Sequence, residues 1–381
     1  MKALSLFANI GVAEAYLKEI GVDVKVANEL VKRRADLYSA IYPDTEMICG
    51  DITDKNIFNK ILDESLKNEI EVIMATPPCQ GMSTAGQQLK WDKRNELIIP
   101  VLEMVKKIKP KYVFIENVPM FLKTEIDYNN SKILIPDLIK KVLGKDYNIE
   151  ISVIDTKDYE VPQMRERAII LLSLKSVKTI WHLPPKSDKV VTLKDAIGNL
   201  PEVDPFIKDI SKEELLEMFP DFEKKKKQAL KISKWNNPPH HIKRQVEVMR
   251  YTPSGCSAFA NKKHKPVKED GTFVKGYFNT YKRQNWDTPA YTVTMDNRKI
   301  SSQNNVHPGR FIGKSADGYD LYSDPRALTL YELMIVSSLP ANWNIPLNTP
   351  EAFLRSTIGE GIPPLFVKKL FNNLKREACL K

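Results

Sequence analysis

Residues 4–29, LSLFANIGVAEAYLKEIGVDVKVANE, have the pattern of a strand, a turn, a helix and a second strand. Leu4–Ala8 is a short apolar run, and Gly11–Ile20 carries apolar residues at helical spacing. The apolar run Val22–Ala27 predicts the next strand, and Glu29 follows it. Two strands joined through a helix over so short a connection are typical of a parallel sheet covered by helices. This stretch therefore predicts an α/β fold.

The same alternation continues to about residue 175. We expect further strands at Glu46–Cys49, Val72–Ala75, Tyr112–Glu116, Asn148–Ile154 and Arg167–Leu174, and helices at Glu29–Ile41, Lys55–Lys67, Asn95–Ile108 and Ser131–Leu143. After Pro184-Pro185 the pattern stops, and helix signals return at Thr329–Ser338 and Pro364–Glu377. The sequence predicts a parallel sheet covered by helices in the first domain and a second domain after Pro184-Pro185 that is rich in Lys, Asn and Pro, with short β-prone pieces.

The charge of the chain is concentrated in one segment. The 381 residues include 58 Lys+Arg and 48 Asp+Glu, a net charge of +10. Residues 223–283 hold 16 Lys+Arg and 4 Asp+Glu, or +12, so the rest of the chain carries −2. Aromatic residues are interleaved with these cations, which indicates a surface for a polyanion such as nucleic acid. The run Lys224–Lys227 by itself is more typical of a solvated face.

Compartment and metal content can also be predicted. The chain has no apolar run of about 18 residues, and its N-terminus reaches Asn9 and Glu14 too early for a signal peptide. Its four cysteines are widely scattered, and its five histidines lack ligand spacing. We therefore expect a cytoplasmic protein without a membrane segment, a disulfide framework or a metal site.

Polar residues follow three of the expected strands. Asn9-Ile10-Gly11 opens a turn after the first strand, Glu29 ends the second, and Asp51 ends the third. Ligands of open parallel sheets bind at these strand ends, where successive acids suit the hydroxyl and amino groups of a nucleoside. The chain has no Gly-x-x-x-x-Gly-Lys phosphate loop, and its first turn is poor in Gly. The pattern predicts a nucleoside-bearing cofactor without a phosphate chain.

The segment Ala75-Thr76-Pro77-Pro78-Cys79-Gln80 places a cysteine at the edge of the sheet. Its two prolines make the turn extended and rigid, so we expect Cys79 to be presented to a ligand, as a nucleophile. Glu116 ends the next expected strand, and the string Gln163–Arg167 contains two arginines. A carboxyl group between an apolar strand and a loop can stay protonated, and arginines favour a thiolate and hold carbonyl oxygens.

Taken in order, these segments resemble the cytosine-5 DNA methyltransferase family. The resemblance spans nearly the whole chain and rests on Phe7–Gly11, Glu29, Asp51, Pro78-Cys79-Gln80, Asp92-Lys93-Arg94, Glu116-Asn117-Val118, Gln163–Arg167, Arg326–Thr329 with Glu332, and Gly359–Pro364. Pro-Cys-Gln, Glu-Asn-Val and Gln-x-Arg-x-Arg in this order are highly specific. The resemblance implies a protein that acts on double-stranded DNA. Its Rossmann-like, S-adenosyl-L-methionine-dependent methyltransferase sheet would lie in a discontinuous domain, 1–185 plus about 345–381, to which the helix from Pro364 returns. A smaller, mostly β or irregular target-recognition domain would span about 186–344.

The resemblance also implies roles for individual residues. Cys79 would add to carbon 6 of a flipped cytosine, protonated Glu116 would bond ring nitrogen 3 and the amine, and Arg167 would hold the carbonyl. Arg165 would support the thiolate and the acid, and carbon 5 would accept the methyl group of S-adenosyl-L-methionine. Residues implied to hold this cofactor are Phe7, Ala8, Asn9, Ile10, Gly11, Glu29, Asp51, Ile52, Pro78 and Glu360. Those implied to hold DNA are Gln80, Ser83, Arg250, Ser254, Lys262, Lys263, Lys265, Thr292, Thr294 and Arg298.

Two positions depart from the family pattern. The first turn usually has Gly where Asn9 stands, and Asn tolerates a left-handed backbone better than other side chains do. The last motif is usually Gly-Asn-small-Val-Pro-Pro, but Glu360 and Gly361 occupy its second and third places. The predicted contact of Glu360 with the cofactor is therefore open.

Four other functions remain open. A tRNA cytosine-5 methyltransferase would share all the catalytic motifs, although the basic second domain favours duplex DNA. In an amino-directed methyltransferase an aromatic residue would replace Cys79. A dinucleotide oxidoreductase would need Gly-x-Gly-x-x-Gly, which is missing. A catalytically inactive DNA-binding relative has only the altered last motif in its favour. We expect a monomeric DNA methyltransferase that is either the modification partner of a restriction endonuclease or a solitary relative.

Overall fold

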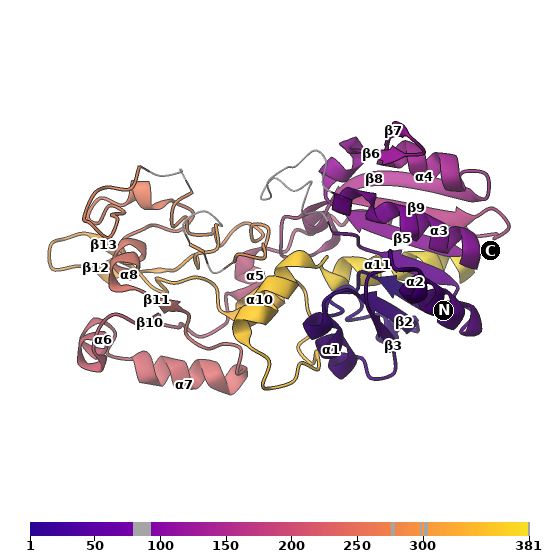
Figure 1. Ribbon diagram of the computed structural model, residues 1–381. Helices are drawn as coiled ribbons and strands as arrows, with labels where there is room; N and C mark the ends of the chain where they lie inside the picture. The colour runs from indigo at the N-terminus through magenta and orange to yellow at the C-terminus, as the bar shows by residue number, and fades with distance from the viewer. Residues whose placement is uncertain (79–92, 276–278, 298, 301–303, 380–381) are drawn as a thin grey trace.

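The computed structural model describes residues 1–78, 93–275, 279–297, 299–300 and 304–379. Its centre is a seven-stranded sheet of order β3-β2-β1-β4-β5-β9-β8 (Figure 1). The strands are β1 (Lys2–Leu6), β2 (Asp23–Glu29), β3 (Glu46–Cys49), β4 (Val72–Ala75), β5 (Tyr112–Asn117), β8 (Tyr147–Asp155) and β9 (Glu166–Leu174). The order reverses between β1 and β4, and ligands of open α/β sheets bind at such a reversal.

The sheet is mixed, whereas the sequence predicted a parallel one. The first five strands in chain order are parallel, but β9 runs antiparallel to both β5 and β8. A short connection, the 3-10 helix η4 (Thr156–Tyr159) and a loop, joins β8 to β9, and parallel strands need a crossover of about a dozen residues. The insertion of β9 beside β5 places Arg167 opposite the carboxyl end of β5.

Helices cover both faces of the sheet, and two apolar clusters hold them there. On one face α2 (Lys55–Lys67), α3 (Ile98–Ile108) and α4 (Ile135–Leu143) pack against alternate strand residues. On the other face lies α11 (Pro364–Cys379), the last helix of the chain, with α1 (Lys32–Ile41) near the β2 end. The apolar side of α11 therefore returns the C-terminal segment to the sheet built by the first half of the chain (Figure 1).

Two predicted helices are wrong. Residues 11–20 form turns that end in the 3-10 helix η1 (Lys18–Ile20), because the left-handed Gly11 and the Tyr42 ring packed against it hold the chain in a tight loop. Residues 131–143 are divided between β7 (Ser131–Leu134) and α4, because Pro136 begins the helix and the left-handed pair Asn129-Asn130 turns β6 (Glu125–Tyr128) back onto β7.

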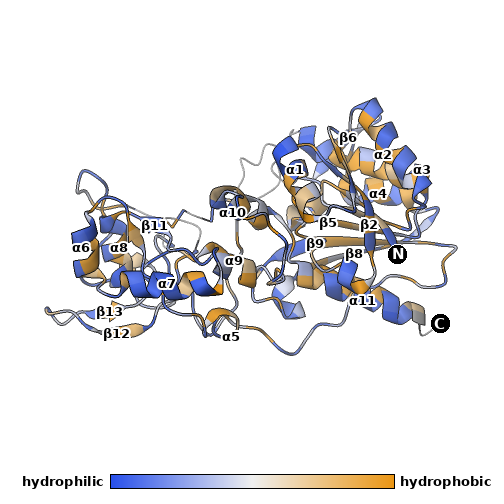
Figure 2. Ribbon diagram, turned by 90° about the horizontal axis from the view of Figure 1, so that it is seen from below, coloured by the Kyte–Doolittle hydropathy of each residue, from blue (hydrophilic) through white to orange (hydrophobic). Residues whose placement is uncertain are grey.

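The segment that follows the sheet is mostly irregular. It contains α5 (Leu193–Ile197), α6 (Lys212–Met218), α7 (Phe222–Ile232), α8 (Lys243–Arg250), the 3-10 helix η5 (Ala258–Ala260) and two small sheets, β10 (Phe206–Ile207) with β11 (His240–His241) and β12 (Phe311–Lys314) with β13 (Asp320–Tyr322). Figure 2 shows that α7, which carries the lysine run, is mainly hydrophilic.

Buried arginines organise this irregular segment. Arg283 and Arg326 are fully buried, and they donate to main-chain carbonyls of residues far apart in the chain, including Met249, His307 and Val203. Arg326 also forms ion pairs of 2.8 Å with Asp324 and Glu332. A buried guanidinium with its donors satisfied supplies the backbone partners that a sheet ladder would otherwise provide.

The chain then returns to the sheet through α9 (Leu330–Val336) and α10 (Glu351–Glu360). Thr329 and Glu332 form a reciprocal capping box at the start of α9. Both helices pack with Ile10, Val12 and α1 in one apolar cluster. The carboxyl end of α10 thus lies beside the first turn of the sheet, although more than 300 residues separate them.

Candidate functional site

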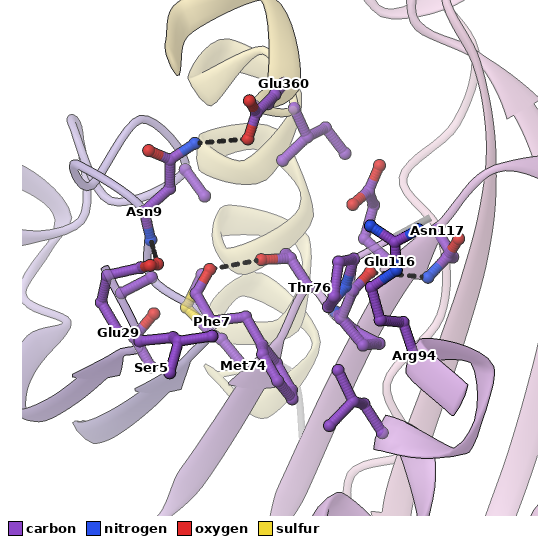
Figure 3. A pocket seen from close by; sticks show the side chains of 18 of the residues that line it. Ser5, Phe7, Asn9, Glu29, Met74, Thr76, Arg94, Glu116, Asn117 and Glu360 are labelled. Atoms are coloured by element: carbon purple, nitrogen blue, oxygen red, sulfur yellow. Dashed lines mark hydrogen bonds between the residues drawn. The ribbon is translucent and has the colours of Figure 1, made fainter. Parts of the chain in front are cut away.

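A cavity of about 1830 Å³ opens at the carboxyl ends of the central strands. Its lining joins most of the predicted site residues: Phe7, Ala8, Asn9, Glu29, Asp51, Ile52, Pro78, Glu116, Arg165, Arg167, Thr292, Thr294 and Glu360. Figure 3 shows several of them around this space. Of the residues predicted to bind the cofactor, Ile10 and Gly11 are described but lie outside the lining. The predicted Cys79, Gln80, Ser83 and Arg298 fall outside the described residues.

The first turn bends through residues with positive φ. Phe7, Asn9 and Gly11 have φ values of 59°, 51° and 82°. Asn9 therefore takes the left-handed conformation expected of it, and its amide nitrogen donates to Glu29 Oε2 at 2.9 Å. A Cβ on Gly11 would lie 2.1 Å from the Tyr42 ring, so glycine is needed there for packing. The turn directs its backbone toward the cavity while α1 supports it from behind.

The two strand-end acids are held in different ways. Glu29 is buried and accepts from the amides of Asn9 and Val31, both at 2.9 Å. Asp51 is exposed and accepts from the amide and hydroxyl of Thr53 at 2.9 and 2.8 Å. Each carboxylate oxygen can accept further bonds. Both side chains are therefore oriented before a ligand with hydroxyl or amino groups arrives.

The turn that leads to Cys79 is fixed from β5. Asn117 donates through Nδ2 to the carbonyl of Pro77 at 2.9 Å, and its Oδ1 accepts from the amide of Val118. Asn117 is buried, so this amide acts as a strut between neighbouring strand ends. This contact agrees with a supporting role of Asn117 rather than a contact with substrate.

A buried ion pair lies at the same edge of the sheet. Arg167 Nε is 2.7 Å from Glu116 Oε1, and both side chains are almost excluded from solvent. Burial raises the pKa of Glu116, although Arg167 and, more weakly, Arg165 oppose the rise. Glu116 can therefore exchange between a carboxylate paired with Arg167 and a protonated acid that donates a hydrogen bond.

Arg165 donates hydrogen bonds to main-chain carbonyls. Its guanidinium donates to Val293 at 2.7 Å, Gly359 at 2.9 Å and Glu360 at 3.2 Å. These carbonyls belong to the irregular segment and to α10, whereas Arg165 itself leads into β9. The side chain therefore joins three parts of the cavity wall, and its positive charge also lowers the pKa of Glu116.

Glu360 is held on the wall by two partners. It forms a 2.8 Å ion pair with Arg34 of α1, and Asn9 Nδ2 lies 3.4 Å from its other oxygen (Figure 3). Burial raises the pKa of Glu360, and Arg34 opposes the rise. Glu360 thus faces the first turn and lies close to Glu29.

Most residues predicted to bind DNA are spread over the irregular segment. Thr292 donates to the carbonyl of Met164 at 2.7 Å, so it packs against the Gln163–Arg167 string. Lys263 forms an ion pair with Asp317, and Lys265 donates to the carbonyl of Phe259 at 2.9 Å. The exposed Lys262 presents its charge to solvent.

Of the remaining predicted DNA contacts, Thr294 lines the cavity, and Arg250 and Ser254 are half-buried in this segment. Ser254 donates to the carbonyl of Gln284 at 3.4 Å, and the guanidinium of Arg250 lies over the ring of Phe219 at 5.5 Å.

Arg34 and Glu14 are among the lining residues to which the sequence assigned no role. Arg34 lies in the helix predicted over Glu29–Ile41. Glu14 lies in the helix predicted over residues 11–20, outside its apolar face, and it is buried in the structure. A buried acid next to a cavity points to function, but its burial follows from turns that periodicity does not reveal.

Over the described ranges, no helix has both the length and the apolar character that crossing a bilayer requires. In that same part of the chain, no three His, Cys, Asp or Glu side chains gather where they could share a metal ion.

Comparisons with known proteins agree with the arrangement. The family model for C-5 cytosine-specific DNA methylase matches residues 1–376. Type II methyltransferase M1.HgaI of Avibacterium volantium is 44% identical over 379 residues, 98% of each chain. M1.HphI of Haemophilus parahaemolyticus is 24% identical over 99% of this chain and 86% of its own.

Among solved structures, a DNA modification methyltransferase encoded within a prophage (E. coli) has a TM-score of 0.64 at 19% identity, over 100% of this chain and 99% of its own, which supports the fold. The chain therefore belongs to the C-5 cytosine-specific DNA methylase family, whose reaction is methyl transfer to carbon 5 of cytosine in DNA.

Proposed function

We propose that Cys79, Glu116, Arg165 and Arg167 form the reacting centre, with S-adenosyl-L-methionine as the methyl donor. The observation that carries this proposal is the buried Glu116–Arg167 pair beside the Pro77-Pro78 turn that leads to Cys79. Glu116 lies at the end of β5, Arg167 lies in β9 beside it, and the Pro77-Pro78 turn follows β4, the other neighbour of β5 in the sheet order, which supports a position of Cys79 near the pair. This arrangement supplies a nucleophile, an acid and a cation, which are the groups that methylation of a cytosine ring needs.

Each side chain then has a defined task. The Cys79 thiolate forms a bond to carbon 6 of cytosine, and the electron pair of the 5,6 double bond moves toward carbon 5 and ring nitrogen 3. Protonated Glu116 donates to that nitrogen, and Arg167 holds the neighbouring carbonyl oxygen, so both stabilise the charge that addition creates. Arg165 is a positioning residue, because its bonds run to the carbonyls of the cavity wall.

The cavity residues fit S-adenosyl-L-methionine, which supplies an electrophilic methyl group when bound. Glu29 and Asp51 offer oriented carboxylates for ribose hydroxyls and an adenine amine, and Phe7 offers an apolar ring. Two buried oxygens, Asn9 Oδ1 and Glu14 Oε2, have no hydrogen-bond partner among the described atoms. Buried polar atoms without partners are costly, so a polar ligand at this wall would satisfy them.

The substrate and setting belong to the same proposal. Duplex DNA would contact the segment 223–283 with its charge of +12, and the target cytosine would leave the stack to reach the cavity. The strongly similar relative is a Type II methyltransferase, so we propose that this chain modifies DNA beside a restriction endonuclease. The recognition segment is proposed to span about 186–344, between the two parts of the catalytic domain, 1–185 and about 345–381.

Covalent trapping tests the proposed centre. The full chain is incubated with S-adenosyl-L-methionine and duplex DNA that contains 5-fluorocytosine, where the fluorine blocks release of the enzyme. We expect a denaturation-resistant protein–DNA adduct with the wild type and none with Cys79→Ser. Bisulfite sequencing of DNA from an expressing host identifies the methylated site. Adduct formation by Cys79→Ser, or methyl transfer to tRNA alone in a parallel assay, would contradict the proposal.

A further inference from the structure

Glu14 is a buried acid on the wall of the cavity that the proposed reaction does not use. It lies in the turns after β1, its side chain is 4% exposed, and it lines the cavity with Ser5 and Met74. Ser5 of β1 lies opposite Met74 of β4 in the strand register, so the two side chains mark one end of the cavity. Figure 3 shows Ser5, Phe7 and Met74 close together on that side.

The hydrogen bonds of Glu14 are incomplete. Ser5 Oγ donates to Oε1 at 2.5 Å, whereas Oε2 is buried and has no partner among the described atoms. The charge of Glu14 acts on the phenols of Tyr38 in α1 and Tyr42 just after it, which are neutral at physiological pH, and no cation pairs with Glu14 among the described residues. Burial raises the pKa of Glu14 to about 7, and the bonds from Ser5 and from its own backbone amide oppose the rise. A buried carboxyl of this kind lacks a cation.

We propose that Glu14 binds the α-ammonium group of S-adenosyl-L-methionine, an assignment that rests on the proposed function. If Glu29 and Asp51 hold the nucleoside, the aminoacyl end of the cofactor extends along the cavity past Phe7. That end carries an ammonium group with three N–H donors, and the sulfonium carries none. The unpartnered Oε2 of Glu14 needs a donor as well as a positive charge, so the ammonium matches it and the sulfonium does not.

This assignment gives Glu14 a measurable protonation change. A cation at Oε2 favours the carboxylate, so ligand binding lowers the pKa of Glu14 and expels its proton. With a pKa of about 7 in the free protein, about half a proton would leave at pH 7 on full ionisation. Tyr38, Tyr42 and Ser5 do not exchange protons near this pH. Glu116 and Glu360 in the same cavity also have raised pKa values, so the part of the signal that belongs to Glu14 is the part that Glu14→Gln removes.

Calorimetric titration of the full chain tests the assignment with three ligands. S-adenosyl-L-methionine has both cationic groups, S-adenosyl-L-homocysteine has only the ammonium, and 5′-methylthioadenosine has neither. We expect Glu14→Gln to weaken binding of the first two at least tenfold and to leave 5′-methylthioadenosine within about twofold. Glu19→Gln is the matched control, because Glu19 lies five residues away and forms an exposed ion pair with Lys368. Titration in buffers of different ionisation enthalpy should show proton release by the wild type and not by Glu14→Gln.

Each other result overturns the assignment. Equal affinities of wild type and Glu14→Gln for all three ligands would remove Glu14 from the site. A loss confined to S-adenosyl-L-methionine would assign Glu14 to the sulfonium, and an equal loss for 5′-methylthioadenosine would mean that the substitution disturbs the whole cavity. If the folded wild type binds none of the three, the proposed cofactor itself is refuted, which is distinguishable from a failure of Glu14 alone.

Discussion

Glu14→Gln should stabilise the ligand-free protein at alkaline pH, although the same substitution weakens cofactor binding. Burial raises the pKa of Glu14 from 4.5 to about 7, and Ser5 opposes the rise. The folded chain therefore holds this proton more tightly than the unfolded chain does. Between pH 4.5 and about 7 the free energy of unfolding falls as pH rises, because ionising the buried acid costs more than ionising it in water.

The size of the effect follows from the shift. The pKa rises by about 2.5 units, and each unit corresponds to about 1.4 kcal/mol, so ionised Glu14 lowers the stability by about 3 kcal/mol at pH 8. At pH 5 the acid is protonated in the folded chain and most of this cost is absent. Glutamine does not titrate, so the stability of Glu14→Gln relative to wild type should be about 2–3 kcal/mol more favourable at pH 8 than at pH 5.

Urea unfolding at pH 5, 6.5 and 8 measures this difference. Tryptophan fluorescence and far-ultraviolet circular dichroism should give coincident transitions, which licenses a two-state treatment. The m-values of wild type, Glu14→Gln and the control Glu19→Gln should agree, so that midpoints report stability. If the effect of Glu14→Gln is the same at pH 5 and pH 8, then Glu14 is not a buried acid of raised pKa, and the reasoning fails.

Three further perturbations follow from the described contacts. Gly359→Ala places a Cβ 2.2 Å from the carbonyl oxygen of Thr294, so α10 must shift; we expect a loss of about 1–3 kcal/mol in thermal unfolding, and an unchanged melting temperature would contradict it. Glu116→Gln cannot supply a proton, and single-turnover methylation should slow by about 10²–10⁴; a rate within threefold of wild type would exclude Glu116 as the acid. Lys262→Ala removes an exposed cation, and fluorescence anisotropy against salt should show the slope of log affinity reduced by about one; an unchanged slope would leave Lys262 as a solvated side chain.

The sequence predicted correctly those helices and strands whose ends are determined by neighbouring residues. The helix Lys55–Lys67 begins where predicted because Asp54 caps the amides of Asn56 and Ile57. The strand Val72–Ala75 ends at the following Thr76-Pro77-Pro78 as expected. The helix predicted over residues 11–20 is wrong because the Tyr42 ring packs against Gly11, and this contact between residues 31 positions apart overrides the helical periodicity.

The site residues divide in the same way into those that the sequence predicts and those that only the folded chain reveals. Residues at strand ends, such as Glu29 and Glu116, could be assigned because parallel strands bring their carboxyl ends to one edge whatever the rest of the chain does. The pair Arg34–Glu360 joins residues 326 positions apart, and it depends on how α10 returns to α1. Neither partner carries a local signal of that contact, so only the folded chain reveals it.

The hydrogen bonds of Arg165 affect which residues can differ between relatives of this protein. Its guanidinium donates hydrogen bonds to the main-chain carbonyls of Val293, Gly359 and Glu360. Every amino acid has such a carbonyl, so these bonds do not depend on side-chain identity. Side chains near Val293 can therefore change without weakening these hydrogen bonds, provided that the backbone path is kept and position 359 stays glycine, because a Cβ there would meet the carbonyl oxygen of Thr294. A chimaera that inherits the segment before α9 from a relative should keep its catalytic geometry if this spacing is preserved. Because Arg165 bonds only to backbone atoms in these contacts, the recognition segment can change its DNA sequence preference while the geometry of the catalytic residues is kept.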